Sequence, residues 1–102
     1  MANIVRGTTP TIKYTFKTVD PASLSVAILT AKQGGTIKLE KDLAAAVVGT
    51  DYLAWTLSQT DTLALSAASI TFLCNWKKED GTRGVSAELT AMVSDNHKNE
   101  VI

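Results

Sequence analysis

Apolar and polar residues alternate with a period of two along most of the chain. Between residues 11 and 17 the even positions are Ile, Tyr and Phe while the odd positions are Thr and Lys, and residues 53–57 repeat the pattern around Trp55. Side chains of a strand point alternately to its two faces, so both segments are predicted to be half-buried strands. Pro10 cannot donate to a strand ladder, which predicts that the first of them lies at an edge or begins at a bend.

Residues 24–33 differ because both parities are apolar or small. Leu24, Val26 and Ile28 fall on one parity, and Ala27, Leu29 and Ala31 fall on the other. Such a strand is covered on both sides, or has a second face that another subunit covers. Gly34 and Gly35 then predict a tight hairpin, whose returning strand, 36–41, is expected to bury Ile37 and Leu39.

The next segments are less regular. Residues 42–49 mix alanines with two valines and a glycine, and we interpret them as a loop. Ser58 followed by Asp61 favours the start of a short helix over 59–65, because the hydroxyl caps the helix and the carboxylate faces its positive end. We expect Leu63 to be its inward residue.

A second hairpin is predicted near the end of the chain. The inward row of its first strand is Ile70, Phe72, Cys74 and Trp76, and the inward row of its second strand is Val85, Ala87, Leu89, Ala91 and Val93. The turn between them, Glu79 to Thr82, contains Gly81. After Ser94 the sequence becomes polar, which is typical of a loose tail.

Short strands with turns about every ten residues predict an all-β fold. We predict an antiparallel β-sandwich of six to seven strands with immunoglobulin-like architecture and one short crossover helix. Residues 1–94 would form the single domain and residues 95–102 a polar C-terminal tail. The immunoglobulin Cys…Trp…Cys pattern is absent, so that likeness is one of architecture only.

Composition narrows the partners that the chain can have. Among its 102 residues, ten Lys and Arg balance ten Asp and Glu. No net field attracts nucleic acid or an anionic membrane, and we expect neither as a partner. No apolar run approaches the roughly 20 residues that span a bilayer, and the first residues lack the apolar core of a signal peptide.

The residue types that carry catalysis are scarce. The chain has one cysteine, Cys74, in an apolar row where a buried thiol with a raised pKa is expected, and one histidine, His97, in the polar tail. The carboxylates fall mainly at turns, and no glycine-rich phosphate loop is present. We therefore expect no catalytic, cofactor-binding or metal-binding residues and no enzymatic activity.

Four apolar residues occupy strand positions that alternation assigns to solvent, and they suggest a function. Val26, Ile28, Leu73 and Met92 lie on faces that a monomer of this size normally makes polar. We predict these four as interface positions. The competing explanation is that the crossover helix and the loops cover them.

The order of several short segments resembles a known family. Arg6-Gly7-Thr8-Thr9-Pro10-Thr11 runs into the first strand, Ala27 to Gly35 precedes Leu39-Glu40-Lys41-Asp42-Leu43, and Leu57 to Leu63 and Asn75-Trp76-Lys77 precede Asp80-Gly81-Thr82. Together these segments resemble short tail-associated proteins of phages and prophages of Gram-positive gut bacteria, and they are similar to the N-terminal β-sandwich of phage upper-baseplate proteins. The resemblance implies a structural role and no catalytic residues.

Our leading hypothesis is accordingly a non-enzymatic phage or prophage structural protein of a tail or baseplate, acting by subunit assembly or docking. Its partners would be other tail or baseplate proteins or further copies of itself, in a possible homo-oligomer, and it would occupy the host cytoplasm during assembly and then the virion. The alternative is a module that recognises carbohydrate or protein of the host surface, with Tyr52 as its exposed aromatic. An enzyme or enzyme inhibitor is a third, disfavoured class.

Overall fold

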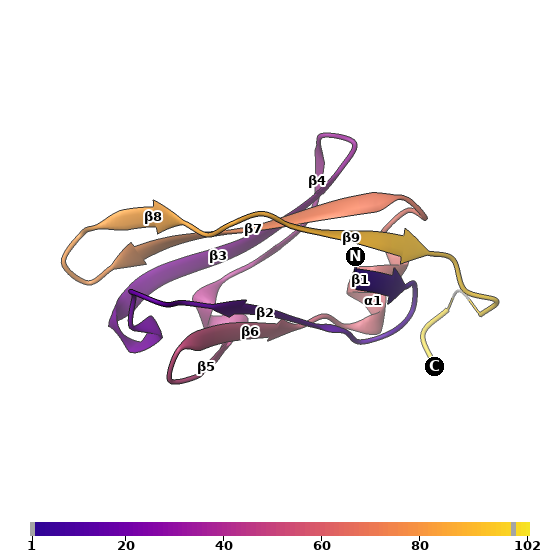
Figure 1. The fold of residues 1–102 in the computed structure, drawn as a ribbon. Helices are drawn as coiled ribbons and strands as arrows, with labels where there is room; N and C mark the ends of the chain where they lie inside the picture. Colours follow the sequence, from indigo (N-terminus) through magenta and orange to yellow (C-terminus); the bar gives the residue numbers. More distant parts are fainter. Residues whose placement is uncertain (1, 99) are drawn as a thin grey trace.

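The computed structural model describes residues 2–98 and 100–102, and they form two sheets packed face to face (Figure 1). The larger sheet contains, in spatial order, β1 (Ala2–Val5), β9 (Leu89–Ser94), β7 (Ser69–Lys78), β3 (Leu24–Gln33) and β4 (Thr36–Lys41), with β8 (Arg83–Val85) also pairing with β7. The smaller sheet contains β2 (Thr11–Thr15), β6 (Tyr52–Thr56) and β5 (Val47–Val48). The all-β sandwich is thus confirmed.

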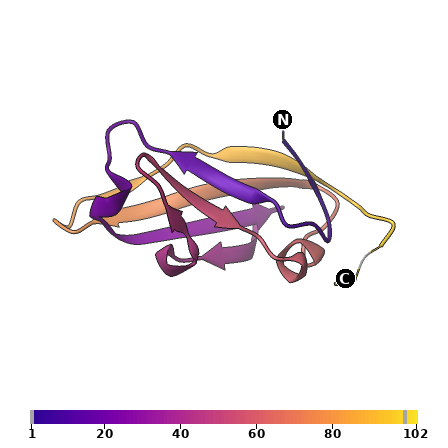
Figure 2. The same cartoon turned by 90° about the horizontal axis from the view of Figure 1, so that it is seen from below.

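The core lies between the two sheets, and the view from below shows the smaller sheet lying across the larger one (Figure 2). Trp55 of β6 and Phe72 of β7 are the largest fully buried side chains, and the ring of Tyr14 meets Trp55 edge-on at 6.5 Å between centroids. The indole Nε1 of Trp55 donates to the Asp42 carbonyl at 2.9 Å, so the buried ring keeps its polar atom satisfied. The predicted inward rows of β6 and β7 contribute Leu53, Trp55, Ile70, Phe72 and Cys74 to this core.

The local signals for turns and caps are also confirmed. Gly34 and Gly35 both adopt positive φ in the β3–β4 hairpin, as does Gly81 in the β7–β8 turn. The helix α1 (Gln59–Leu63) begins at a capping box, because Ser58 Oγ accepts from the Asp61 N–H and the Asp61 carboxylate accepts from the Ser58 N–H. Its fully buried residue is Thr62, however, whereas the expected Leu63 is only half-buried.

Two irregularities shift the predicted parity of β3 and of the last strand. A bulge between Leu24 and Val26 turns Leu24 into the core with Ala27, so Leu24 does not share a face with Val26. The last strand is broken at 86–88 into β8 and β9, which leaves Val85 exposed rather than inward. Alternation in the sequence does not reveal either break.

Other details of the predicted layout are wrong. Ile37, expected to be buried, is 52% exposed, because the β3–β4 hairpin extends beyond the smaller sheet. Residues 42–49 are not a plain loop: they contain the short 3₁₀ turn η2 (Leu43–Ala45) and β5, as residues 21–23 contain η1 (Pro21–Ser23). The strands number nine within the described residues, and β1, which was not predicted, pairs with β9 in parallel.

The larger sheet has two unlike ends. At the broad end β1, β9, β7, β3 and β4 lie side by side next to α1. At the narrow end only residues 24–28, 75–78 and 83–85 lie side by side within the described chain. Residues beyond Ser94 return toward α1, where the Ile102 N–H donates to Gln59 Oε1; Asn99 of this predicted tail lies outside the described residues.

Candidate functional site

The face of the larger sheet that points away from the smaller sheet carries its exposed apolar side chains. At the narrow end the strand register aligns Ile28 with Asn75 and Val85 in one row across β3, β7 and β8. The next row outward contains Val26, Lys77 and Arg83. We call the group of Val26, Ile28, Leu73, Val85, Lys77 and Arg83 the outer patch.

Three of the four predicted interface positions belong to this patch. Val26 and Ile28 are 40% and 37% exposed, and Leu73, which pairs with Thr30 one row further along, is half-buried. Met92 is exposed on the same face but lies at the broad end, where it pairs with Ser69 and Asn3. The structure therefore does not bring Met92 together with the other three.

Sequence reasoning missed Val85 and the cations of the patch. Val85 is 55% exposed and was assigned to the core because its parity was counted through the break at 86–88. Neither Lys77 nor Arg83 takes part in an ion pair among the described residues; Arg83 donates only to the Gly81 carbonyl, at 3.4 Å. An apolar centre with cations at its rim is the result.

Two shallow depressions follow the patch along β3 and β7. One of about 210 Å³ lies over Val26, Ile28 and Arg83, and a second of about 300 Å³ lies over Thr30, Leu73 and Glu88. Asn75 borders both, so the two depressions are neighbours on this face. The first depression combines the apolar side chains of Val26 and Ile28 with the cations Lys77 and Arg83, a mixture that protein-binding surfaces also contain.

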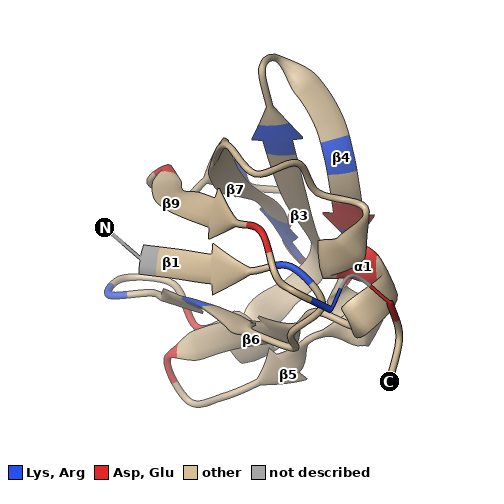
Figure 3. Ribbon diagram, turned by 90° about the vertical axis from the view of Figure 1, so that its right-hand side faces the viewer, with Lys and Arg blue, Asp and Glu red and all other residues tan. Residues whose placement is uncertain are grey.

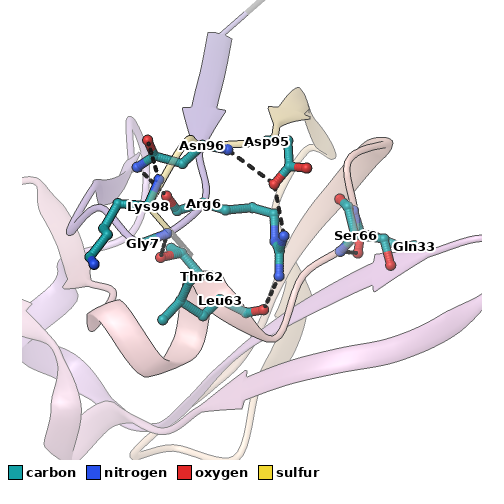
Figure 4. Close-up of polar contacts among 9 residues, drawn as sticks. All are labelled: Arg6, Gly7, Gln33, Thr62, Leu63, Ser66, Asp95, Asn96 and Lys98. Carbon is teal, nitrogen blue, oxygen red and sulfur yellow. Dashed lines mark hydrogen bonds and ion pairs between the residues drawn. The ribbon is translucent and has the colours of Figure 1, made fainter. Parts of the chain in front are cut away.

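Polar side chains gather instead at the broad end, where they bind one another (Figure 4). The Arg6 guanidinium donates to the Asp95 carboxylate and to the Leu63 carbonyl, each at 2.8 Å. The buried Thr62 hydroxyl accepts from the Gly7 N–H and donates to the Thr8 carbonyl. These bonds join the end of β1, α1 and the residues after β9, so the cluster is structural.

Gln33 adds a second such joint at the broad end. Its side chain is buried, and its amide donates to the Ser66 carbonyl at 2.7 Å while its carbonyl accepts from the Ser66 N–H at 2.8 Å. The amide thereby fixes the loop after α1 to the end of β3, as the close-up shows (Figure 4).

The chemically reactive side chains lie apart. Cys74 is fully buried, as predicted, and burial raises the pKa of its thiol to about 11, so it is not a nucleophile at neutral pH. His97 is exposed after β9. The described residues contain no group of three or more His, Cys, Asp or Glu side chains that could hold a metal ion, and none of their helices is long and apolar enough to cross a membrane.

Comparisons with known proteins give a fold and no family. No protein-family model and no curated protein sequence matches the chain. Among solved structures, the crystal structure of CopC from Methylosinus trichosporium OB3b is similar over 96% of this chain and 89% of its own, with a TM-score of 0.58 and 15% sequence identity. Identity at that level establishes the shared sandwich fold alone.

These comparisons overturn the predicted phage assignment. The structure to which the chain is similar is CopC, which is not a tail or baseplate protein, so the resemblance to tail-associated and upper-baseplate proteins is wrong. The alternative of a host-surface recognition module gains no support either. The predicted resemblance rested on turns and their order, and such features recur in unrelated sandwiches because they follow from strand geometry.

Proposed function

We propose that the protein is a non-enzymatic association module that binds further copies of itself through the outer patch. The observation that carries this proposal is the patch itself: Val26, Ile28 and Val85 are exposed side by side, and Lys77 and Arg83 beside them lack a carboxylate partner in the described chain. Exposed apolar side chains that share one face favour burial against another surface.

The same chain offers a surface of complementary character. Val47 and Val48 of β5 are 62% and 47% exposed, and the exposed acidic residues Asp42 and Asp51 flank them in the sequence. Figure 3 shows an acidic segment at the turn between β5 and β6 of the smaller sheet. Apposing two copies of the patch would bring cations together, whereas the patch against the β5 surface pairs opposite charges. The contact we propose is therefore heterologous.

Copper binding, which the likeness to CopC raises, does not fit the residues of this chain. The described side chains that could bind copper lie in different surroundings. Cys74 is buried between the sheets, Met92 lies on the outer face and His97 is exposed after β9. A copper site needs several of these side chain types converging on one point. The described residues provide no such convergence.

Light scattering behind size exclusion, across a hundredfold range of protein concentration, tests the proposal. We expect the average mass to rise with concentration, and the rise to weaken at high salt because screening reduces the charge contribution. Ile28→Lys should abolish the rise, since it adds a charge at the centre of the patch without disturbing the core.

Ile37→Lys is the matched control, because Ile37 is more exposed and lies on the β3–β4 hairpin outside the patch. It should leave the concentration dependence unchanged. A wild-type protein that stays monomeric over the whole range would show that the outer patch does not serve self-association.

A further inference from the structure

One side of the sandwich is open between β2 and the β8–β9 segment. On that side β1 pairs with residues 91–94 of β9, but no described residue pairs with the same edge of residues 83–90. Across the opening, β2 pairs only with β6 within the described chain. Two strand edges therefore border the opening, one from each sheet (Figure 1).

The hydrogen-bond pattern identifies which backbone groups of β8 face this opening. The Lys78 N–H donates to the Thr82 carbonyl, and the Ser86 N–H donates to the Cys74 carbonyl. Backbone groups in an antiparallel pair alternate between facing the partner and facing away. Arg83 and Val85, which fall between these bonded positions, accordingly direct their N–H and C=O groups away from β7.

Behind this edge lies a cleft that leads into the space between the sheets. One cavity of about 340 Å³ is bordered by Phe16, Val19, Trp76 and Leu89, and a second of about 280 Å³ continues along Ile12, Phe72 and Leu89. Leu89 borders both cavities and is 40% exposed. The charged residues that line the first cavity are Lys13 and Lys17; neither has an ion-pair partner among the described residues, and the Lys13 ammonium lies over the Tyr52 ring, 4.4 Å from its centre.

A buried hydroxyl group at the first cavity lacks a partner. Tyr14 is 95% buried, and its hydroxyl makes no hydrogen bond within the described residues, although the Ser86 side chain lies near it. Buried polar groups are normally satisfied in folded proteins. This residue is the floor of a site to which an incoming chain can supply a polar group.

We propose that this cleft binds an extended segment of a partner protein, which adds as a strand to β8 alongside Arg83 and Val85. Side chains of an added strand alternate between the cleft and solvent, so the segment has apolar residues at every second position. Lys17 at the rim favours acidic residues at the intervening positions. This site shares Arg83 and Val85 with the outer patch, but it uses their backbone edge and the interior of the sandwich rather than their side chains on the face of the sheet.

Amide hydrogen exchange in the presence of a synthetic peptide tests the proposal. The probe is an eight-residue peptide of alternating Val and Glu with blocked ends, added in excess to the full chain. We expect the Val85 amide to exchange at least tenfold more slowly with the peptide, and the fluorescence of Trp76 to change in parallel. A peptide of alternating Val and Lys should have no effect.

Two variants at one position separate the backbone edge from the side chain. Val85→Pro removes the outward N–H and should abolish protection of the neighbouring edge, while the ladder to β7 stays intact because that N–H does not contribute to it. Val85→Ala keeps the N–H and should still bind, although it removes a side chain of the outer patch.

Two outcomes of the exchange experiment would overturn the proposal. Equal exchange of the Val85 amide with and without the peptide would show that the edge does not accept a strand. Protection that appears in concentrated protein alone would identify the occupant as a second copy and refute the assignment to a separate partner. A wild-type protein that stays monomeric at every concentration but shows protection by the peptide would refute the proposed function and leave this site standing.

Discussion

The two ends of the larger sheet differ in whether their polar side chains have partners within the protein. At the broad end Arg6 and Gln33 bind backbone groups of α1 and of the loop after it, and Thr62 of α1 binds backbone groups of the segment after β1, so these side chains make hydrogen bonds inside the protein. At the narrow end Lys77 and Arg83 have no carboxylate partner among the described residues, and Val85 beside them is exposed.

That difference distinguishes polar side chains that stabilise the fold from polar side chains that are available to a partner. Hydrogen bonds that join distant segments stabilise the fold and leave little capacity for a partner. Unpaired cations next to exposed apolar side chains stabilise nothing within the chain, but they can contribute when a complementary surface covers them. Changes at the broad end should therefore alter stability, and changes at the narrow end should alter association.

The largest effect is expected from Thr62→Val at the broad end. The substitution leaves the Gly7 N–H and the Thr8 carbonyl without their partner in a buried place, and should lower the free energy of unfolding by about 2–3 kcal/mol. Urea denaturation measures this loss. Thr56→Val is the control: its exposed hydroxyl contacts only that of Thr11, so a change within about 0.5 kcal/mol is expected. Equal losses in both variants would contradict a special role for the cluster.

At the narrow end, exchange of charges should weaken association without changing stability. Arg83→Glu and Asp51→Lys should each raise the dissociation constant about threefold to tenfold, and the double variant should recover most of the loss if the two surfaces meet. Sedimentation velocity measures the constants, and Glu79→Lys, an exposed acid of the β7–β8 turn, provides the matched control. Additive losses in the double variant would place Asp51 outside the contact.

The same comparison explains what the sequence could predict. Inward rows such as Ile70, Phe72 and Cys74 were correct because alternation is a local consequence of strand geometry and burial. The capping box at Ser58 was also local, since both partners lie within one turn. Val85 was misplaced because the break at 86–88 depends on Ser86 Oγ binding the Cys74 N–H across the hairpin. A bond of that kind leaves no periodic signal.

Long-range pairing limited the prediction of the site in the same way. Alternation along each strand predicted that Val26, Ile28 and Leu73 point to the outer face. Their position beside Val85 and Arg83 could not be predicted, because it depends on the register of three strands. Gly84 illustrates the point: a Cβ there would lie 2.2 Å from the Trp76 ring, so the glycine permits that ring to lie against β8. The residues next to Gly84 in the sequence do not indicate that a glycine is needed at this position.

Tyr14→Phe tests the contribution of the buried Tyr14 hydroxyl, which lies at the cleft of the narrow end. Removing a buried hydroxyl that lacks a partner should raise the free energy of unfolding by about 1 kcal/mol at pH 7. Burial raises the pKa of Tyr14 from 10.0 to about 12, so its neutral form contributes stability that is complete below pH 10 and is lost as the pH rises toward 12. The variant should lose less stability than the wild type over that interval. A destabilised variant at pH 7 would mean that the hydroxyl is satisfied in solution.

The smallest expected effect concerns Asp61, which belongs to the broad end. Burial acts to raise the pKa of its carboxyl, but hydrogen bonds from Ser58 and the ion pair with Lys41 at 3.0 Å outweigh burial and hold that pKa below its ordinary value of 3.8. The carboxylate therefore contributes stability that is complete above pH 3.8 and disappears as the pH falls through the folded-state pKa. Asp61→Asn should lower the free energy of unfolding by about 0.5–1 kcal/mol at pH 7, and the difference from the wild type should shrink between pH 4 and pH 2. Urea midpoints across that range measure it, and a difference that persists undiminished at pH 2 would show that lost capping geometry, rather than lost charge, causes the effect.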